Sequence, residues 1–208
     1  FSTLSFHSTK NFQCGEGGAL VLNSLDYVER AEIIREKGTN RKKFISGDIQ
    51  KYEWIEKGSS YLMAEVLASL IYTQILEFRN IQENRLSVWD RYFAGLEYNF
   101  EKINMRIMKP NSKNVAHMFA VIAPSEFKRD EFISKMALLG TQVNAHYQPL
   151  HLSPAGRKFG KAIGSFSGTL ELSARLFRLP IWSHPEQSYS KKVVKDALLT
   201  INLMRDLK

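Results

Sequence analysis

The chain has 208 residues, of which 29 are lysine or arginine and 21 are aspartate or glutamate, so its formal net charge is +8. Hydrophobic residues make up 44% and charged residues 24%, values near globular averages that exclude a disordered, collagen-like or coiled-coil chain. The length allows one large domain or two small ones, and no apolar run approaches the roughly 20 residues that a membrane-spanning helix needs.

The first residues predict a β-hairpin. Leu4 and Phe6 alternate with polar residues, and the glycine-rich segment 15–18 leads into the apolar run 19–22. Glycines ease the turn that such a hairpin requires because they adopt conformations closed to other residues. We therefore expect two paired strands joined by a turn that carries several polar side chains.

A helix is expected after the hairpin. Ser24 can cap its first turn, Asp26 lies near its positive end, and Gly38 follows its end near Lys37. Residues 38–58 are mostly polar and show no clear period, which predicts a long functional loop.

Apolar residues then recur at helical spacing over residues 61–98, which predicts two helices with a bend near Asn80. For the rest of the chain we expect a buried strand at 116–123, a helix at 125–139, a short strand at 141–145, a loop at 148–168 and an amphipathic helix at 169–179. Residues 183–186 fit a capping box for a last helix. Alternating strands and helices predict an α/β or α+β class.

The basic residues are not arranged in a pattern that is typical of nucleic-acid binding. Basic residues cluster only in short runs such as 41–43 and 191–192, and the sequence has no zinc-finger, RNA-binding or basic-plus-heptad pattern. A basic surface also suits a small substrate that bears a diphosphate. We expect no nucleic-acid and no membrane partner. Because Cys14 is the single cysteine and no signal segment opens the sequence, we expect a cytoplasmic setting.

Lys10 lies on the expected turn, among hydroxyl groups and glycines. A lysine held neutral by burial or by a neighbouring cation can attack an aldehyde covalently. Spacing alone favours the simpler interpretation, a solvated turn lysine, because most lysines are exposed. The glycines of residues 15–18 do not match a phosphate loop, because the lysine precedes them and no helix follows at once.

The histidines do not form a metal-binding pattern. His146 and His151 are near each other in the chain, but a proline-bent segment separates them, which argues against a preformed metal site. They either donate hydrogen bonds to a sugar or phosphate in a pocket, or hold a loop in place. Cys14 has no partner pattern, and Glu16 is either a turn-capping carboxylate or a site residue.

The lysine segment resembles that of a known enzyme family. Residues 5–11, with Ser5, His7 and Lys10, followed by residues 15–20, are similar to the lysine segment of the DegT/StrS-type sugar-nucleotide aminotransferases. The likeness continues at residues 30–41, 58–63, 116–119, 146–151 and 153–156. Within the family, these segments look like those of the transaminases that make dTDP-4-amino-4,6-dideoxygalactose. The resemblance implies a role in surface polysaccharides such as enterobacterial common antigen.

The resemblance implies specific roles for individual residues. Lys10 would bond covalently to pyridoxal 5'-phosphate and move a proton between substrate and cofactor carbons. Ser5 would hydrogen-bond the cofactor phosphate. Ser60 stands where many members have an asparagine that reaches the phosphate of the partner subunit. Residues near the sugar nucleotide would be Asn40, His117, His146, Tyr147 and His151.

The resemblance also implies an architecture. The fold would be the C-terminal part of a fold-type I pyridoxal-phosphate-dependent transferase, with residues 1–78 in the large cofactor domain and residues 79–208 in a small α/β domain. Residues 38–47 would lie across the interface of a homodimer. The amino donor would be glutamate, and the acceptor would be carbon 4 of a dTDP-4-keto-6-deoxyhexose.

In the family, the half that precedes the lysine supplies the aspartate paired with the cofactor's ring nitrogen, and this chain begins near the lysine. We therefore expect the chain alone to bind the cofactor poorly and to show negligible turnover. Two alternatives stay open: an aminotransferase for another keto-sugar nucleotide, and a non-catalytic sensor or regulatory relative that retains the fold.

Overall fold

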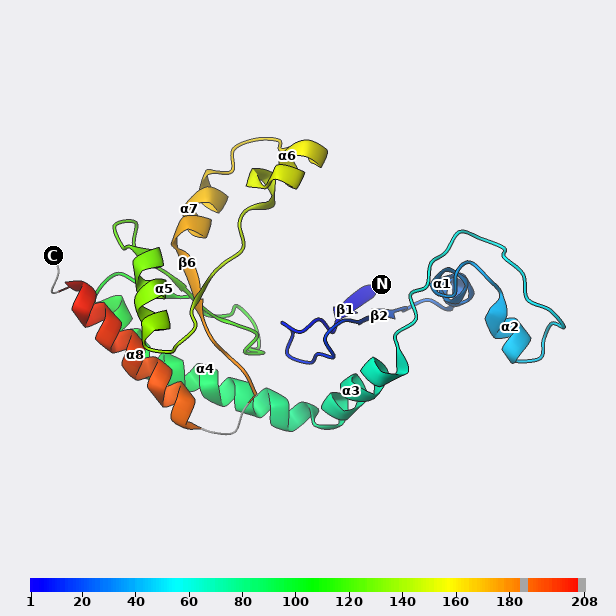
Figure 1. The fold of residues 1–208 in the computed structure, drawn as a ribbon, viewed down its shortest axis with the longest axis horizontal. Coiled ribbons are helices and arrows are strands. Elements are labelled where there is room, and N and C mark those ends of the chain that lie inside the picture. Colours follow the sequence, from blue (N-terminus) through cyan, green and yellow to red (C-terminus); the bar gives the residue numbers. More distant parts are fainter. Residues whose placement is uncertain (184–186, 206–208) are drawn as a thin grey trace. The chain divides into compact units, whose positions relative to one another are not determined.

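The computed structural model describes residues 1–183 and 187–205 of the chain. The chain divides into two compact units, Phe1–Phe78 and Arg79–Lys208 (Figure 1). In the described residues, no helix is both long enough and apolar enough to span a membrane. The assignment of the two units to a large cofactor domain and a small domain stays a prediction.

The first unit begins with the predicted hairpin. Strand β1 (Ser2–Ser5) pairs antiparallel with β2 (Gly18–Val21), with Ser5 opposite Gly18. A Cβ atom on Gly18 would lie 2.8 Å from the Leu4 carbonyl oxygen, so this pairing requires a glycine. The hairpin therefore closes directly next to the segment that carries Lys10.

Ser24 caps the next element as predicted, because its hydroxyl accepts a hydrogen bond from the Asp26 N–H. A short 3₁₀ helix, η1 (Leu25–Tyr27), leads into α1 (Val28–Arg35). The helix ends two residues before the predicted Lys37. The chain leaves the helix there because Lys37 adopts the left-handed conformation, with a φ of 65°.

Residues 38–58 contain more structure than the predicted loop. Helix α2 (Arg41–Ile45) occupies part of the segment. Single bridges pair Thr39 with Trp54 and Glu36 with Ser60. The lack of a clear period in the sequence reflects the shortness of these pieces, none of which has an apolar face long enough to show one.

Two helices follow, as predicted, but they meet at Glu77 rather than near Asn80. Helix α3 (Glu65–Leu76) ends at Glu77, and α4 (Phe78–Glu101) continues into the second unit. The apolar periodicity indicates that helices are present, but the end of α3 has no glycine or proline to mark it in the sequence.

The second unit is a four-stranded antiparallel sheet packed with helices (Figure 1). Its strand order is β3-β4-β6-β5, with bounds β3 (Arg106–Ile107), β4 (Phe119–Ile122), β5 (Asn144–Ala145) and β6 (Leu176–Leu179). The helices are α5 (Arg129–Leu138), α6 (Pro154–Phe159), α7 (Ser167–Arg175) and α8 (Gln187–Arg205), and η2 (Leu150–Leu152) precedes α6.

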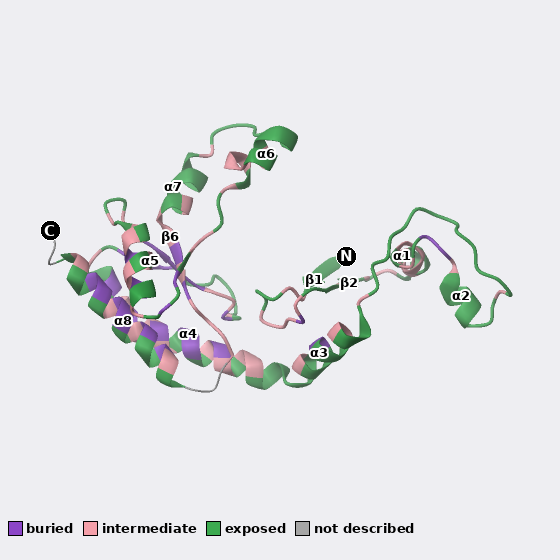
Figure 2. Cartoon of the chain, in the orientation of Figure 1, coloured by how far each residue is buried: buried purple, intermediate pink, exposed green. Residues whose placement is uncertain are grey.

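The core of the second unit lies between one sheet face and helices α4, α5 and α8 (Figure 2). Alternate residues of β4 and β6 enter it, among them Phe119 and Phe177, both fully buried. Phe132 from α5 packs on Phe177, with 5.0 Å between ring centroids. The buried Tyr92 hydroxyl of α4 donates to the Pro180 carbonyl, so even the polar end of this side chain is paired.

Several predictions for the second unit were wrong in extent. Residues 176–179 form strand β6, although we predicted a helix over 169–179. Phe177 and Leu179 are buried and alternate with less buried residues, which fits a strand. Residues 148–168 contain η2 and α6, and the predicted strands and the 125–139 helix are shorter. The predicted capping box at 183–186 lies largely outside the described residues.

Candidate functional site

Lys10 lies on a segment that backbone hydrogen bonds hold closed. The Phe6 N–H donates to the Gly17 carbonyl at 2.8 Å, and the Ser8 N–H donates to the Gly15 carbonyl at 3.0 Å. Gly15 adopts a φ of 89°, which favours glycine. These bonds extend the hairpin beyond its strands and present Lys10 beyond their end.

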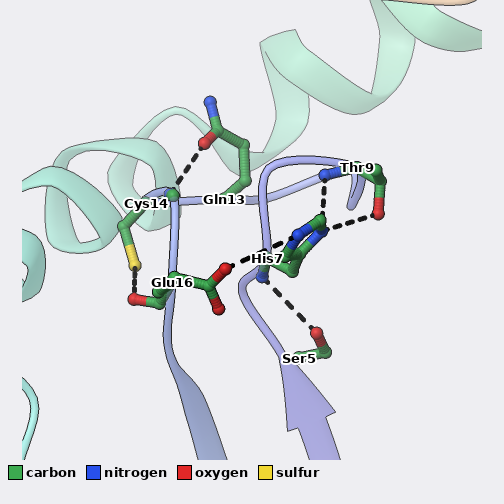
Figure 3. Close-up of polar contacts among 7 residues, drawn as sticks. Ser5, His7, Thr9, Gln13, Cys14 and Glu16 are labelled. Atoms are coloured by element: carbon green, nitrogen blue, oxygen red, sulfur yellow. Dashed lines mark hydrogen bonds and ion pairs between the residues drawn. The ribbon is translucent and has the colours of Figure 1, made fainter.

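The side chain of His7 organises the same segment. Its Nδ1 lies 3.0 Å from the Thr9 hydroxyl and accepts the Thr9 N–H at 3.3 Å. Its Nε2 lies 3.6 Å from a carboxylate oxygen of Glu16. The Ser5 hydroxyl accepts a weak hydrogen bond from the His7 N–H at 3.4 Å. The imidazole therefore connects the turn before Lys10 with the glycine-rich segment after it (Figure 3).

The residues after Lys10 are held by helix α3 and by the first residue of α4. Phe12 stacks on Phe78, with ring centroids 4.9 Å apart. The Gln74 side chain accepts the Gln13 N–H at 3.0 Å and donates to the Gln13 carbonyl at 2.6 Å. Cys14 is buried, and its thiol donates to the Glu16 carbonyl at 3.3 Å. The thiol is therefore buried and paired within the same segment.

The donor groups at this segment fit an aldehyde-bearing, phosphate-bearing cofactor. The Lys10 side chain is exposed, and among the described residues none bonds to its ammonium group. The Ser5 hydroxyl is also exposed, and it keeps its own O–H free to donate to an anion. An amine that can bond an aldehyde and a hydroxyl that can bond a phosphate thus stand on one segment.

Ser60 and Asn40 lie on other parts of the first unit. Ser60 is exposed and its backbone pairs with Glu36. Asn40 is already engaged: its side-chain oxygen accepts the Glu53 N–H at 2.7 Å. This bond connects the two ends of the 38–58 segment, so the Asn40 amide nitrogen is the group left for a substrate.

The remaining predicted residues lie in the second unit. His117 follows Ala116, which adopts a left-handed φ of 46°, and its carbonyl accepts a hydrogen bond from the buried Arg85 at 3.0 Å. His151 stacks on Phe166, with 4.4 Å between ring centroids. These contacts hold the two histidines in separate places within this unit.

His146 and Tyr147 come together with Arg178, which the sequence analysis missed. The Tyr147 ring lies 5.4 Å from the His146 ring and 5.4 Å from the Arg178 guanidinium carbon. His146 Nδ1 and Arg178 Nε are buried, and the described residues offer neither atom a hydrogen-bond partner. Burial, and then the charge of Arg178, lower the pKa of His146. Arg178 was hidden because residues 169–179 were interpreted as one helix.

The described part of the chain contains no group of three or more His, Cys, Asp or Glu side chains that could hold a metal ion. The lysine segment itself presents an amine, a hydroxyl and an imidazole that faces a carboxylate.

Comparisons with known proteins bear on this site. The DegT/DnrJ/EryC1/StrS aminotransferase family matches residues 1–197. The chain is 27% identical over 195 residues to the dTDP-3-amino-3,4,6-trideoxy-alpha-D-glucose transaminase of Streptomyces venezuelae, covering 93% of this chain and 48% of that protein. It is 26% identical over 155 residues to the UDP-4-amino-4,6-dideoxy-N-acetyl-beta-L-altrosamine transaminase of Campylobacter jejuni, covering 72% of this chain and 39% of that protein.

The fold matches a solved aminotransferase as well. Helicobacter pylori PseC, an aminotransferase involved in the biosynthesis of pseudoaminic acid, superimposes with a TM-score of 0.82 at 18% identity, covering 96% of this chain and 52% of that one. The predicted α/β fold of a pyridoxal-phosphate-dependent aminotransferase is thus confirmed. The chain spans about half the length of the relatives that it matches.

Proposed function

Because the chain belongs to the DegT/DnrJ/EryC1/StrS aminotransferase family, we propose that it supplies the reactive lysine of an enzyme that transfers an amino group to a nucleotide-linked keto sugar. The aminotransferases of this family depend on pyridoxal phosphate. The observation that carries the proposal is the placement of Lys10: its amine is exposed and unpaired among the described residues, on a turn held by the hairpin and by α3. Retention of Lys10 in a segment that matches the family favours the enzyme over a non-catalytic relative.

Three residues of the first unit would hold the cofactor. Lys10 Nζ would bond its aldehyde carbon with loss of water, the Ser5 hydroxyl would donate a hydrogen bond to its phosphate, and the Ser60 hydroxyl would donate to the cofactor phosphate of the partner subunit. Pyridoxal phosphate, when bound, supplies a conjugated ring that takes up the electron pair of a breaking C–H bond. Lys10 Nζ, once displaced by the incoming amine, would move that proton between the substrate carbon and the cofactor carbon.

For the substrate, we propose the dTDP-4-keto-6-deoxyhexose that the sequence resemblance implies, with glutamate as amino donor and dTDP-4-amino-4,6-dideoxygalactose as product, for surface polysaccharide synthesis. A dTDP-sugar transaminase among the relatives supports the nucleotide, while a UDP-sugar transaminase is the source of the alternative. The cluster of His146, Tyr147 and Arg178 offers a cation and aromatic rings suited to a sugar-nucleotide diphosphate. The sequence resemblance also implies substrate roles for His117, His151 and Asn40.

We further propose a homodimer in a cytoplasmic setting. The 38–58 segment exposes three aromatic side chains that touch one another: Phe44 and Tyr52 at 5.7 Å, and Tyr52 and Trp54 at 6.3 Å between ring centroids. Trp54 is 73% exposed. Large exposed aromatic groups are typical of surfaces that a partner covers, in line with the expectation that residues 38–47 lie across a subunit interface.

The test is an aminotransferase assay on the product of the complete coding sequence. Purified protein is mixed with glutamate and either a dTDP-linked or a UDP-linked 4-keto-6-deoxyhexose, and amino-sugar nucleotides are identified by mass. We expect an amino sugar from the dTDP substrate and none from Lys10→Ala. Product from the UDP substrate alone would correct the nucleotide, and no product from any keto sugar would refute the enzyme.

A further inference from the structure

His7 is not used by the chemistry proposed above, yet the turn that presents Lys10 is built on it. The Lys10 N–H donates to the His7 carbonyl at 2.9 Å. The ring of His7 folds onto the same turn, where its Nδ1 accepts the Thr9 N–H. Every hydrogen bond that the structure describes for Thr9 and Lys10 is made with His7.

The geometry determines where the imidazole proton lies. A backbone N–H can only donate, so Nδ1 must present its lone pair to Thr9. In the neutral ring the proton is then on Nε2, the nitrogen that faces the Glu16 carboxylate at 3.6 Å. The negative charge of Glu16 favours a proton at this position (Figure 3).

The two sides of Lys10 are held differently. After Lys10, the chain is held by the Phe12–Phe78 stack at the start of α4 and by the two hydrogen bonds between Gln13 and Gln74 of α3. Between the Ser8–Gly15 hydrogen bond and Lys10, all described contacts of the turn are made by His7. Loss of the His7 ring would therefore release the turn on one side and leave the other side in place.

We propose that His7, as the neutral imidazole with its proton on Nε2, is a positioning residue for Lys10. The inference rests on the proposed function, because it gives the Lys10 amine a reaction to perform. A displacement of about 1 Å in a reacting group can cost about a hundredfold in rate. Glu16 assists by favouring the tautomer that the turn requires.

Two substitutions separate this role from a merely structural one. His7→Ala removes the acceptor for the Thr9 N–H. His7→Asn restores it, because an asparagine oxygen accepts the N–H two residues further on in an Asx turn. The matched control is Gln74→Ala, which releases Gln13 on the other side of Lys10 and leaves the His7 ring untouched.

The first readout needs no cofactor. In ¹⁵N-histidine-labelled chain at neutral pH, with the His7 signals identified by their loss in His7→Ala, we expect an unprotonated Nδ1 and a protonated Nε2. We expect Glu16→Gln to reduce the population of this tautomer. A protonated Nδ1 in the parent chain would overturn the proposal.

The second readout is amide hydrogen exchange, again without cofactor. We expect His7→Ala to accelerate exchange at Thr9 and Lys10 roughly fivefold, the effect of losing one ordinary hydrogen bond, and His7→Asn to stay within about twofold of the parent. Gln74→Ala should accelerate Gln13 instead. Equal exchange at Thr9 in the parent and in His7→Ala would contradict the role of the ring.

The third readout connects the turn to the amine. The product of the complete coding sequence is treated with pyridoxal phosphate and borohydride, and labelling of Lys10 is compared with that of exposed Lys51 by mass. We expect His7→Ala to lower the Lys10-to-Lys51 ratio about tenfold and His7→Asn to restore it. An unchanged ratio in His7→Ala overturns the positioning role. If the parent itself shows no preference for Lys10, the proposed function fails, while the first two readouts still report on His7.

Discussion

Gly38 and Gly58 lie where two parts of the 38–58 segment pass each other at close range. A Cβ atom on Gly38 would lie 1.7 Å from the Glu56 carbonyl oxygen, and one on Gly58 would lie 2.2 Å from the Gly38 nitrogen. Gly38 also has a φ of 78°. Steric exclusion and the left-handed conformation therefore both require glycine at residue 38.

We expect Gly38→Ala to disrupt this crossing. Exchange of the Ile55 and Glu56 amides, which donate to the Gly38 carbonyl, should accelerate at least roughly a hundredfold. The matched control is Gly47→Ala, where φ is 85° but no atom lies within 4 Å of the added Cβ. Gly47→Ala should accelerate amide exchange roughly tenfold or less, because the left-handed conformation is the only strain that it introduces. Similar effects of the two substitutions would contradict the steric argument.

His146 predicts a pH dependence of stability. Burial and the charge of Arg178 lower its pKa below the ordinary value of 6.5. The unfolded chain then binds a proton at His146 before the folded chain does, so this residue's contribution to stability falls as pH falls through about 6.5 toward the folded pKa. We expect His146→Gln to reduce the loss of stability between about pH 7.5 and pH 5.5, measured by urea unfolding. An unchanged slope would argue against the low pKa.

At the scale of elements, Arg85 connects α4 with the two segments at one end of the sheet's central pair of strands, one before β4 and one after β6. The residue is 7% exposed, and its guanidinium donates to the carbonyls of Ala116, His117 and Ile181 at 3.1, 3.0 and 3.4 Å. Burial lowers its pKa. Three carbonyls from two separate segments thus depend on one side chain.

We expect Arg85→Met to lower the free energy of unfolding by about 2–4 kcal/mol, because it leaves buried carbonyls without donors. The control is Arg91→Met on the same helix, which loses bonds to Ser190 and Ser87 in a more exposed place and should cost about 1 kcal/mol or less. Urea unfolding of the two variants measures both values, and equal losses would show that Arg85 is not special.

Sequence patterns predicted some helices and strands and missed others. The apolar spacing of 61–98 predicts α3 and α4 because it extends over enough residues to reveal its period, and the glycine-rich turn separates the short strands β1 and β2 from other patterns. Strand β6 is as short as β1 and β2, but it follows α7 directly, so its alternation merges with the helical pattern. Its identity depends on pairing with β4 and β5, which are distant in the chain.

At the scale of the whole molecule, the two units differ in how much core they contain. The connected core of buried apolar residues lies in the second unit, whereas β1, β2 and α3 expose large side chains such as Leu20, Val66 and Leu76. Burial of apolar surface is the main favourable term in folding. The second unit should therefore be the more stable one.

Amide exchange measures this difference. We expect the amides of β1 and β2 to exchange at least about a hundredfold faster than those of β4 and β6 in the 208-residue chain, because local opening costs less free energy where little apolar surface is buried. Equal protection of the two sheets would show that the hairpin has stability that its exposed side chains do not explain.

A second expectation at this scale concerns the cofactor. Since the chain spans about half the length of its relatives, we expect the 208-residue chain alone to show substoichiometric labelling of Lys10 by pyridoxal phosphate and borohydride, and negligible turnover. Mass measurement of the labelled peptide decides. Stoichiometric labelling of Lys10 in this chain would show that its own residues suffice to bind the cofactor.

Local patterns in the sequence are enough to identify the family, the candidate lysine and most helices, because spacing and a contiguous motif are properties of neighbouring residues. Three features became visible in the folded chain alone: β6 is a strand, Arg178 lies with His146 and Tyr147, and α3 holds one side of the Lys10 turn while His7 holds the other. These features depend on contacts between residues far apart in the chain, or on the orientation of a ring, and neither leaves a periodic signal in the sequence.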